Sequence, residues 1–583
     1  MKKNILIVST ECAPYQKLGG LGDANADFSK AYKKFFPENE ITVILPLYGV
    51  EKPLDEHFQN GFKLVNQNIK FEYKFGLYKA HAQIYELEKP LNNVNIKYIY
   101  SDIYSHIDDI YKGDVFMNST AFSNAVLTYL DKFTAPEKLP DIIHTTDFPV
   151  FLKDFKSEKL KKIKLIHIIH NAGMFYQVIT DVFQASCCLR GKEEFRKIFK
   201  DKDFKKLCHL IYKKYKKPVI PFFKNIEKEC RFINDSYYSI KADKNNQDVL
   251  EILNFALKDL FKDDEKDNPI TFNPIKKCLK ETNGWITDSI TYYEELYKDK
   301  FFSDGLYETI LNTKEKSHAI LAGIDLERYN PYKSNNIAFK LEDNIEAFKQ
   351  KNRQYLLDNF SIEKIKSNKI DSNLFSSKET AILGHLAPME NSILIFMSSR
   401  LDIYQKGIDI AFSAISALFG KKNIQFIFSS PNALKEPIIT NFTNSLLKDK
   451  DLEGRFIFLD SYIPFERYCA GSDLFLMPSR FEPCGFSQLI AMRFGCLPVV
   501  LATGGLNDTI TDDFNGFKTA HSIFETNSYN EYTETLSRAI DKIQNKNQRI
   551  NYVKNALNYD CSWNFEKINS YDKVYDKVLN VEN

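Results

Sequence analysis

The alternation of short apolar runs with helix-like segments constrains the fold of this chain more than any other feature. An apolar run at 4–8 is followed by a glycine-rich loop and then by a helical segment that begins with Asp23. A helical pattern also covers 119–133. Strands that alternate with helices predict a parallel sheet covered on both faces. The other runs expected to be strands of this first sheet are 41–45, 94–100, 142–143 and 163–169.

A second series of the same kind begins near Ser392. We expect helices at 408–418 and 486–494 between its strands. A chain of 583 residues is too long for one ordinary domain, so two lobes are expected. Ligands of parallel sheets bind at the carboxyl ends of the strands, which predicts a ligand cleft between the lobes. The expected strands of this series are 393–397, 424–429, 456–459, 474–477 and 497–501.

The stretch 177–282 has a different composition, with many Lys, Asp, Asn and Phe residues and few glycines. Pieces such as 249–261 show helical periodicity. We interpret it as a mostly helical insertion within a first domain that covers 1–327, and 328–560 as the second domain.

Charge and cysteine content exclude several classes of protein. Lys and Arg number 79 against 77 Asp and Glu, which gives no electrostatic argument for nucleic acid or a membrane surface as partner. No apolar stretch approaches the roughly 20 residues that a membrane span needs. The ten cysteines form no CxxC pair, and the cysteines at 187, 188, 208 and 230 match no zinc spacing. We therefore expect a cytoplasmic protein with reduced thiols and no metal site.

Three motifs lie where expected strands end. The first is Lys-Leu-Gly-Gly-Leu-Gly-Asp at 17–23, where glycines would let the backbone approach a phosphate and Lys17 would add a charge. A tight turn between strand and helix is the alternative interpretation, and the P-loop pattern is absent. The second is Glu-Pro-Cys-Gly at 482–485 with Thr-Gly-Gly at 503–505, which suits sugar hydroxyls and a diphosphate. The third, 400–407, carries two cations that would neutralise a departing diphosphate.

Together these motifs resemble those of the bacterial glycogen synthase and plant starch synthase family. The resemblance covers about the first 170 residues and then runs from about Trp285 to the end. It implies the GT-B arrangement, in which two Rossmann-like lobes face each other across a cleft, and a final helix at 561–583 that packs back on the first domain. Further segments that carry the resemblance are 9–14, 166–171 and Ser562-Trp563 followed by Tyr571 and Tyr575.

The resemblance also implies an activity. Family members transfer glucose from ADP-glucose, less often UDP-glucose, to the non-reducing end of an α-1,4-glucan, with retention and without a metal or other cofactor. Glu482 matches the active-site acid, and Arg400 and Lys406 match the cations that bind the donor phosphates. His170 would contact the transferred glucose, and Asp147 would help to place glucose or acceptor.

Nine further residues are expected to bind substrate by the same resemblance. Lys17 and the amides beside it would face the donor diphosphate from the first lobe, and the two later glycine turns would hold sugar and phosphate from the second. The nine residues are Lys17, Gly19, Gly20, Asn171, Cys484, Gly485, Thr503, Gly504 and Gly505.

Two departures from the family pattern bear on activity. Arg400 and Lys406 are separated by one residue more than usual, so either a bulge restores both cations or Lys406 is displaced. Ala322 replaces an asparagine and removes one hydrogen-bonding group. The alternatives are a retaining GT-B enzyme with another donor or acceptor, or a weakly active glucan-binding regulatory protein. The sequence leaves open the nucleotide base, the role of the insertion, the oligomeric state and any allosteric regulation.

Overall fold

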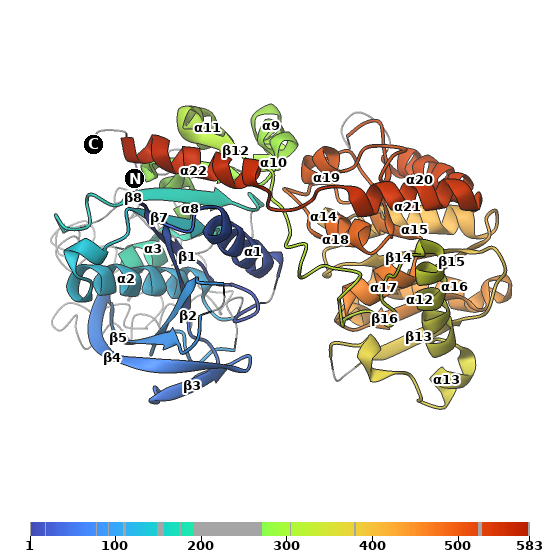
Figure 1. The fold of residues 1–583 in the computed structure, drawn as a ribbon, viewed down its shortest axis with the longest axis horizontal. Helices are drawn as coiled ribbons and strands as arrows, with labels where there is room; N and C mark the ends of the chain where they lie inside the picture. Colours follow the sequence, from blue (N-terminus) through green and yellow to red (C-terminus); the bar gives the residue numbers. More distant parts are fainter. Residues whose placement is uncertain are drawn as a thin grey trace, which may run out of the picture. The chain divides into compact units, whose positions relative to one another are not determined.

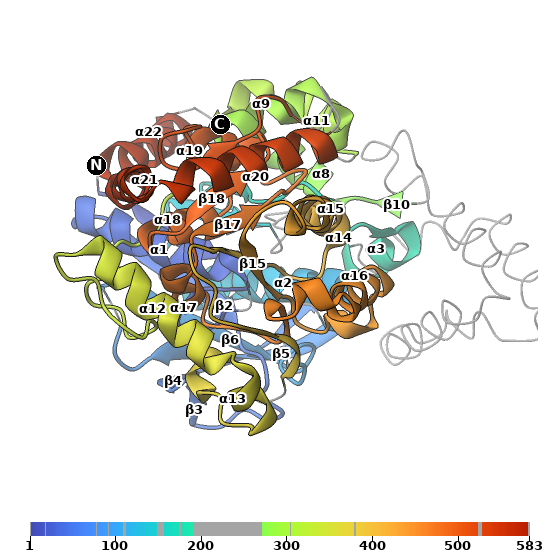
Figure 2. The same ribbon diagram turned by 90° about the vertical axis from the view of Figure 1, so that its right-hand side faces the viewer.

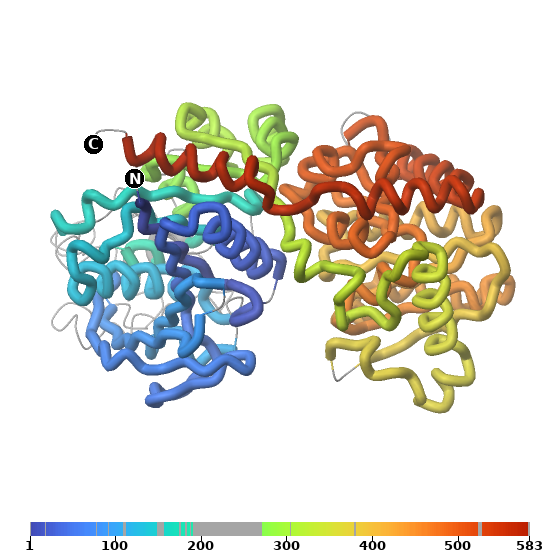
Figure 3. Tube along the Cα trace, in the orientation of Figure 1, coloured from blue at the N-terminus to red at the C-terminus, as the bar shows by residue number. Residues whose placement is uncertain are grey.

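The computed structural model describes residues 2–17, 19–76, 78–90, 92–108, 112–147, 157–173, 177–189, 271–303, 305–377, 380–522 and 528–580. The chain divides into two compact units. The first comprises Met1–Ile286, Leu296–His318 and Ile568–Asn583, and the second comprises Thr287–Glu295 and Ala319–Lys567. This division differs from the predicted boundary after residue 327, because the chain enters the second unit once at Thr287 and again at Ala319. Figure 3 shows the course of the chain.

The first unit is built on a sheet whose centre is parallel. β1 (Asn4–Val8) pairs with β2 (Glu40–Pro46) on one side and with β7 (Ile142–Thr146) on the other, and all three run in the same direction. β6 (Asn95–Ser101) and β8 (Lys164–Ile169) continue the parallel arrangement outward. The predicted strands of this series are therefore confirmed, with ends that shift by one to a few residues.

One edge of this sheet is antiparallel, which the prediction of a parallel sheet missed. β3 (Glu56–Gln59), β4 (Phe62–Phe75) and β5 (Tyr78–Leu87) follow one another as hairpins and pair antiparallel up to β6. Along much of β4, buried and exposed residues alternate, as expected for a strand with one solvated face. The sheet order is β12-β11-β8-β7-β1-β2-β6-β5-β4-β3, with β11 at Gly284–Thr287 and β12 at Ser317–Ala319.

The last helix, α22 (Phe565–Asn580), packs on the first unit through buried polar contacts. Asp572 accepts hydrogen bonds from Lys3 Nζ at 2.8 Å and from the Tyr32 hydroxyl. The Tyr575 hydroxyl lies 2.7 Å from Nδ1 of His144. Figure 1 accordingly marks both chain ends beside this unit.

The other helices of the first unit are α1 (Gly20–Phe35), α2 (Val115–Phe133), α3 (Val182–Leu189), α8 (Pro274–Glu281), α10 (Lys300–Ser303) and α11 (Tyr307–Asn312). α9 (Ile290–Lys298) begins in the second unit and ends in the first.

Most of the predicted helical insertion, residues 190–270, lies outside the described residues. Its two ends are described. β9 (Thr180–Asp181) pairs antiparallel with β10 (Thr271–Phe272), so the two described ends of the stretch lie side by side.

The second unit contains a sheet that is parallel except at one edge. β14 (Ile393–Ser398) lies between β15 (Ile424–Ser429) and β17 (Leu474–Met477). All five predicted strands are confirmed. The edge strand β13 (Ala381–Leu386), which we did not predict, pairs antiparallel with β16. The order is β13-β16-β15-β14-β17-β18-β19, with β16 at Arg455–Asp460, β18 at Leu497–Val500 and β19 at Phe517–Lys518.

Helices cover this second sheet, and its core is continuous and apolar. α15 (Ile408–Phe419) packs against α20 (Ser528–Gln544), and α12 (Ile345–Asn359) packs against α17 (Phe465–Gly471) (Figure 2). No helix in the described parts of either unit is long and apolar enough to cross a membrane. The remaining helices are α13 (Ile362–Lys366), α14 (Ile403–Lys406), α16 (Pro437–Lys448), α18 (Ser487–Arg493), α19 (Gly504–Thr509) and α21 (Lys546–Asn558).

Candidate functional site

Each sheet has a point where the strand order reverses, and the predicted site residues follow the strands that meet there. In the second unit the chain runs outward from β14 to β15 and then returns to place β17 on the other side of β14. In the first unit β1 and β7 stand in the same relation. Open α/β sheets bind ligands outside the carboxyl ends of the strands at such points.

In the second unit two of the three predicted catalytic residues, Lys406 and Glu482, contact each other. Lys406 Nζ lies 2.6 Å from Oε2 of Glu482, and their side chains are only 17% and 10% exposed. Lys406 follows β14 and Glu482 follows β17, so the pair joins the two strand ends at the switch point. Each of the two groups thus has a partner of opposite charge beside it in a place with little solvent.

A single helical turn accommodates the extra residue between Arg400 and Lys406. α14 covers Ile403–Lys406; Asp402 caps its start by accepting from the Gln405 amide at 3.0 Å, and Gly407 ends it with φ 61°. A Cβ on Gly407 would lie 2.0 Å from the carbonyl oxygen of Pro478, so only glycine fits there. Lys406 is thus directed to Glu482. Arg400 is about half exposed and donates to the side chain of Gln405.

The predicted Thr-Gly-Gly turn packs directly on the backbone beside Glu482. A Cβ on Gly504 would lie 1.9 Å from the Glu482 carbonyl oxygen, and one on Gly505 would lie 2.1 Å from that of Cys484. The Gly505 amide donates to the Glu482 carbonyl at 3.0 Å. Glycine at both positions therefore lets the turns after β17 and β18 touch.

The Thr-Gly-Gly turn donates hydrogen bonds to groups of the protein itself. The buried Glu295 carboxylate accepts from the Gly504 amide at 3.1 Å and from the Thr503 hydroxyl at 2.9 Å. The Gly505 amide is also bonded within the chain, so both glycine amides have acceptors in the protein, and their contact with a diphosphate stays a prediction. Sequence reasoning missed Glu295, which lies 209 residues before Gly504.

Cys484 and Gly485 shape the turn through their backbones. Gly485 has φ 72°, and Gln488 Nε2 donates to the carbonyl oxygens of Cys484 and Gly485 at 3.0 and 2.8 Å. The Cys484 side chain is buried, and burial raises the pKa of its thiol well above the usual range. A neutral thiol is a poor nucleophile, so the position acts through its backbone.

The glycine loop of the first unit is also closed by a carboxylate. Oε2 of Glu11 accepts from the Gly19 amide at 2.7 Å, and α1 begins at Gly20. Lys17 Nζ lies 2.7 Å from a carboxylate oxygen of Asp23, and the Lys17 side chain is 40% exposed. The loop is therefore held by its own acids, while Lys17 stays accessible from solvent.

Asp147 and His170 are brought together at the neighbouring strand ends. Asp147 follows β7 with φ 38°, and its Oδ1 accepts from the His170 amide, after β8, at 2.8 Å. Asn171 uses its Oδ1 to accept from the Gly173 amide at 2.8 Å, which fixes the turn beyond His170. Left-handed backbone in a non-glycine residue is uncommon and marks Asp147 as a constrained position.

A buried hydroxyl network joins this pair to the glycine loop. Ser9 Oγ accepts from the Thr146 hydroxyl at 2.9 Å and from Asn25 Nδ2 at 2.8 Å. Thr146 ends β7, Ser9 follows β1, and Asn25 lies in α1. The predicted residues of the first unit thus lie together at the carboxyl ends of β1, β7 and β8.

Sequence reasoning also missed a group of residues around Arg480. Arg480 is buried and forms a two-point ion pair with Asp409, at 2.9 and 2.7 Å. Tyr529, on α20, donates to the same carboxylate at 2.5 Å. Arg480 lies two residues before the Glu-Pro-Cys-Gly motif, whereas nothing in the sequence pattern points to Tyr529.

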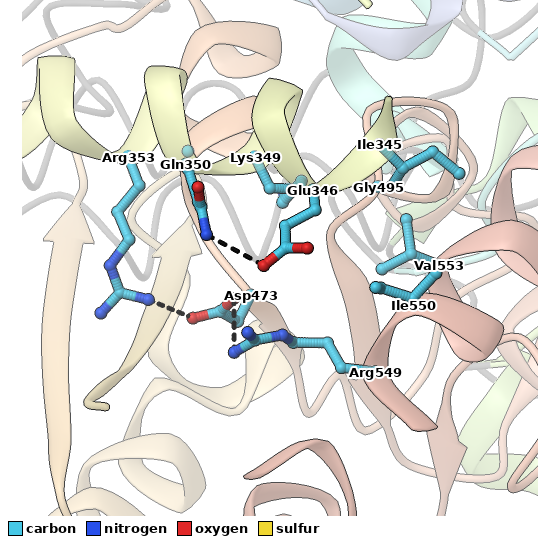
Figure 4. Close-up of a pocket in the computed structure, with 11 residues that line it drawn as sticks. Ile345, Glu346, Lys349, Gln350, Arg353, Asp473, Gly495, Arg549, Ile550 and Val553 are labelled. Carbon is cyan, nitrogen blue, oxygen red and sulfur yellow. Dashed lines mark hydrogen bonds and ion pairs between the residues drawn. The ribbon is translucent and has the colours of Figure 1, made fainter. Parts of the chain in front are cut away.

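A pocket of the second unit lies at the other end of the strands, where Asp473 precedes β17 (Figure 4). Asp473 precedes β17 and accepts from Arg353 at 2.7 Å and from the Leu394 amide at 2.9 Å, while Arg549 lies 3.9 Å away. Lys349 donates to main-chain carbonyls at the ends of two helices. These charges satisfy one another, so we assign the pocket a structural role.

Within the described ranges, no three metal-ligating side chains are grouped in a way that would hold an ion. The expectation that the protein uses no metal stays a prediction.

Two family models match parts of this chain. The starch synthase catalytic domain model covers residues 4–215, and the model of group 1 glycosyl transferases covers 392–542. A glycogen synthase from Kosmotoga olearia is 26% identical over 589 residues, which span 99% of this chain and 98% of that protein. One from Flavobacterium johnsoniae is 27% identical over 592 residues, with 99% of each chain covered.

A solved structure shows the same fold. The catalytic domain of starch synthase IV from Arabidopsis thaliana, bound to ADP and acarbose, superimposes with a TM-score of 0.69 at 21% identity and covers 100% of each chain. The two α/β sheets with their switch points, the motifs at the strand ends and these matches lead to one conclusion. The chain is similar over nearly its whole length to glycogen synthases, and it shares its fold with a starch synthase.

Proposed function

We propose that this protein is a glycogen synthase that transfers the α-glucosyl group of ADP-glucose to the non-reducing end of an α-1,4-glucan, with retention. The observation that carries the proposal is the Lys406–Glu482 pair at the switch point of the second sheet. The relatives named glycogen synthase support the acceptor class. The ADP bound to the Arabidopsis enzyme supports adenine as the base.

The chemistry of glucosyl transfer suits these residues. The bond from the anomeric carbon to the diphosphate breaks through an oxocarbenium-like state, so the departing phosphate gains negative charge while the sugar becomes positive. Lys406 and Arg400 would stabilise the phosphate, and the Glu482 carboxylate would stabilise and orient the sugar. Glu482 is already paired with Lys406, which suits an electrostatic role better than attack on the anomeric carbon.

The first unit would serve the transferred glucose and the acceptor. His170 and Asp147 lie together beyond β8 and β7, and Lys17 lies in the loop after β1. We propose that His170 and Asp147 bind the transferred glucose and that Lys17 adds a positive charge. The acceptor oxygen would attack on the face that the nucleotide leaves, and the departing phosphate oxygen would take its proton. The proposal needs no metal ion and places the reaction in the cytoplasm.

The decisive experiment measures transfer of labelled glucose from ADP-glucose and, in parallel, from UDP-glucose to glycogen. Glu482→Ala removes the carboxylate, and Glu453→Ala removes an exposed glutamate of the same unit as a matched control. We expect transfer from ADP-glucose by the unaltered protein and by Glu453→Ala, and a loss of at least about 100-fold in Glu482→Ala.

The other outcomes are equally informative. Transfer only from UDP-glucose would keep the synthase and change the base. Transfer from neither donor, with nucleotide still bound, would reject the synthase and favour another retaining transferase or a glucan-binding regulatory protein. Transfer that survives in Glu482→Ala would remove Glu482 from the mechanism.

A further inference from the structure

Four residues near the Lys406–Glu482 pair form a compact cluster, which we call the Arg480 clamp: Tyr404, Asp409, Arg480 and Tyr529. The guanidinium of Arg480 meets Asp409 with two parallel hydrogen bonds, at 2.9 and 2.7 Å. It also donates to the Tyr404 carbonyl oxygen at 2.9 Å and contacts the Tyr529 hydroxyl at 3.1 Å. Two-point pairing of this kind fixes direction as well as distance, which a lysine cannot do.

Two aromatic rings complete the clamp. The guanidinium carbon of Arg480 lies 4.6 Å from the centre of the Tyr404 ring and 5.9 Å from that of Tyr529. Burial acts to raise the pKa of Asp409, but hydrogen bonds from Arg480 and Tyr529 hold that pKa below its ordinary value. The carboxylate is thus charged and Arg480 has a fixed counter-ion.

The clamp connects the two segments that carry the proposed catalytic pair. We call 400–407 the cation loop and 478–482 the acid turn. The Arg480 amide donates to the Gln405 carbonyl at 2.9 Å, while its guanidinium holds the Tyr404 carbonyl. Lys406 is the next residue of the cation loop, and Glu482 lies two residues after Arg480 in the acid turn. Arg480 therefore fixes the cation loop directly beside the point where Lys406 reaches Glu482.

Arg480 holds the helical turn of the cation loop that directly precedes Gly407. Tyr404 belongs to this turn, α14, and gives Arg480 both its carbonyl oxygen and its ring. These contacts add to the Asp402 cap and to the close approach of Gly407 to Pro478 in fixing how far Lys406 extends.

We propose that Arg480, held by Asp409 and Tyr529, is a positioning residue that sets the placement of Lys406 against Glu482 and thereby the affinity for the nucleoside diphosphate of the donor. The proposal rests on the proposed glucosyl transfer. Arg480 acts through the cation loop and is given no contact with substrate. Tyr529 extends this control to α20, since its hydroxyl joins the start of that helix to Asp409.

The test uses Tyr529→Phe, which removes one hydroxyl, and Arg480→Lys, which keeps the charge and removes the two-point pairing. Arg538→Lys is the matched control, because Arg538 is likewise paired with aspartate, in its case with Asp512 and Asp513, and lies 5.8 Å from the ring of Phe517. Each protein is measured for ADP affinity by calorimetry, for KM of donor and of glycogen separately, and for amide hydrogen exchange of peptides from 400–410.

We expect Tyr529→Phe to weaken ADP binding and to raise the donor KM by about 3- to 10-fold, the effect of one hydrogen bond. Arg480→Lys should do so by at least about 10-fold, since it loses two-point pairing with Asp409. Both should leave the glycogen KM within about twofold and should speed exchange in the cation loop. Arg538→Lys should change neither ADP affinity, nor either KM, nor exchange in the cation loop.

Two results would overturn the proposal. Unchanged ADP affinity and donor KM in both variants, with a lower melting temperature, would show that the clamp only stabilises the fold. Unchanged exchange in the cation loop would show that Arg480 does not hold it. If the unaltered protein transfers no glucose but binds ADP, and the variants weaken that binding, the clamp is upheld and the proposed transfer fails.

Discussion

Nζ of Lys406 lies 2.6 Å from Oε2 of Glu482, and the two side chains are largely removed from solvent. The pair joins the ends of β14 and β17, the strands between which the order of the second sheet reverses. The cation that we propose for the departing phosphate and the acid that we propose for the glucose are thus adjacent in this structure. Donor binding would have to divide Lys406 between Glu482 and phosphate, so the carboxylate and the donor compete for one ammonium.

The pair should show coupled effects on stability. Lys406→Met leaves the Glu482 carboxylate buried without its cation, which should lower the free energy of unfolding by about 1–3 kcal/mol. Adding Glu482→Gln removes the unpaired charge, so the double variant should be more stable than Lys406→Met alone. Urea denaturation of the unaltered protein, Lys406→Met, Glu482→Gln and the double variant gives the coupling energy. Strictly additive effects would contradict an interaction between the two residues.

Two variants of Lys406 test whether the reaction needs a positive charge at this position. Lys406→Met should raise the donor KM or reduce turnover by at least about 10-fold, because one phosphate cation is lost. Lys406→Arg should retain more activity than Lys406→Met, since it keeps the charge. Equal activity of the two variants would show that charge at this position is not what the reaction needs.

The glycines after β18 should tolerate no side chain. Gly505→Ala places a Cβ about 2.1 Å from the Cys484 carbonyl oxygen, so the turns after β17 and β18 would have to separate. We expect a loss of at least about 3 kcal/mol of stability and loss of transfer. Gly420→Ala is the control, because a Cβ there meets nothing within 4 Å and φ is −79°. Urea denaturation and transfer assays compare the two; equal stabilities would show that the turns are not in contact.

Sequence reasoning located the strands of the switch points because their patterns are local. Apolar runs such as 393–397 and the motifs that follow them need only neighbouring residues to be recognised. The predicted site residues accordingly lie at the carboxyl ends of β1, β7 and β8 in one unit and of β14, β17 and β18 in the other.

Contacts between distant segments could not be predicted in this way. Glu295 and Gly504 are 209 residues apart, and Arg480 and Tyr529 are 49 apart. Each contact depends on the folded arrangement of several elements, which local periodicity does not contain. The hairpins β3 to β5 were missed for a different reason: the alternating pattern along β4 is typical of a half-exposed antiparallel edge and differs from the continuous apolar run of a buried parallel strand.

Glu295 should prove to be a structural residue. Its carboxylate holds the Thr503 hydroxyl and the Gly504 amide, and Glu295→Gln would place an amide donor beside an amide donor. We expect the free energy of unfolding to fall by about 1–3 kcal/mol, with the donor KM unchanged within about twofold. Glu294→Gln alters the exposed neighbour on the same helix and should change neither quantity. Tighter ADP binding by Glu295→Gln would instead mean that Glu295 competes with phosphate for the turn.

Two buried histidines should make the first unit sensitive to acid. Burial, reinforced by neighbouring histidines, lowers the pKa of His144 and of His167 from 6.5 to about 3. Between these values the unfolded chain binds protons that the folded chain does not, so stability is lost as pH falls below about 6.5. From pH 6.5 to pH 5 each histidine should cost about 2 kcal/mol.

The pH dependence can be assigned by substitution. His167→Gln removes one titrating group, so its free energy of unfolding should fall less steeply from pH 7 to pH 5 than that of the unaltered protein. His81→Gln, at a histidine side chain that is 73% exposed, should keep the original slope. Urea denaturation at pH 7, 6 and 5 measures the three slopes. A slope in His167→Gln equal to that of the unaltered protein would mean that His167 takes up a proton inside the folded unit, and hence that the strand end carrying His170 admits water.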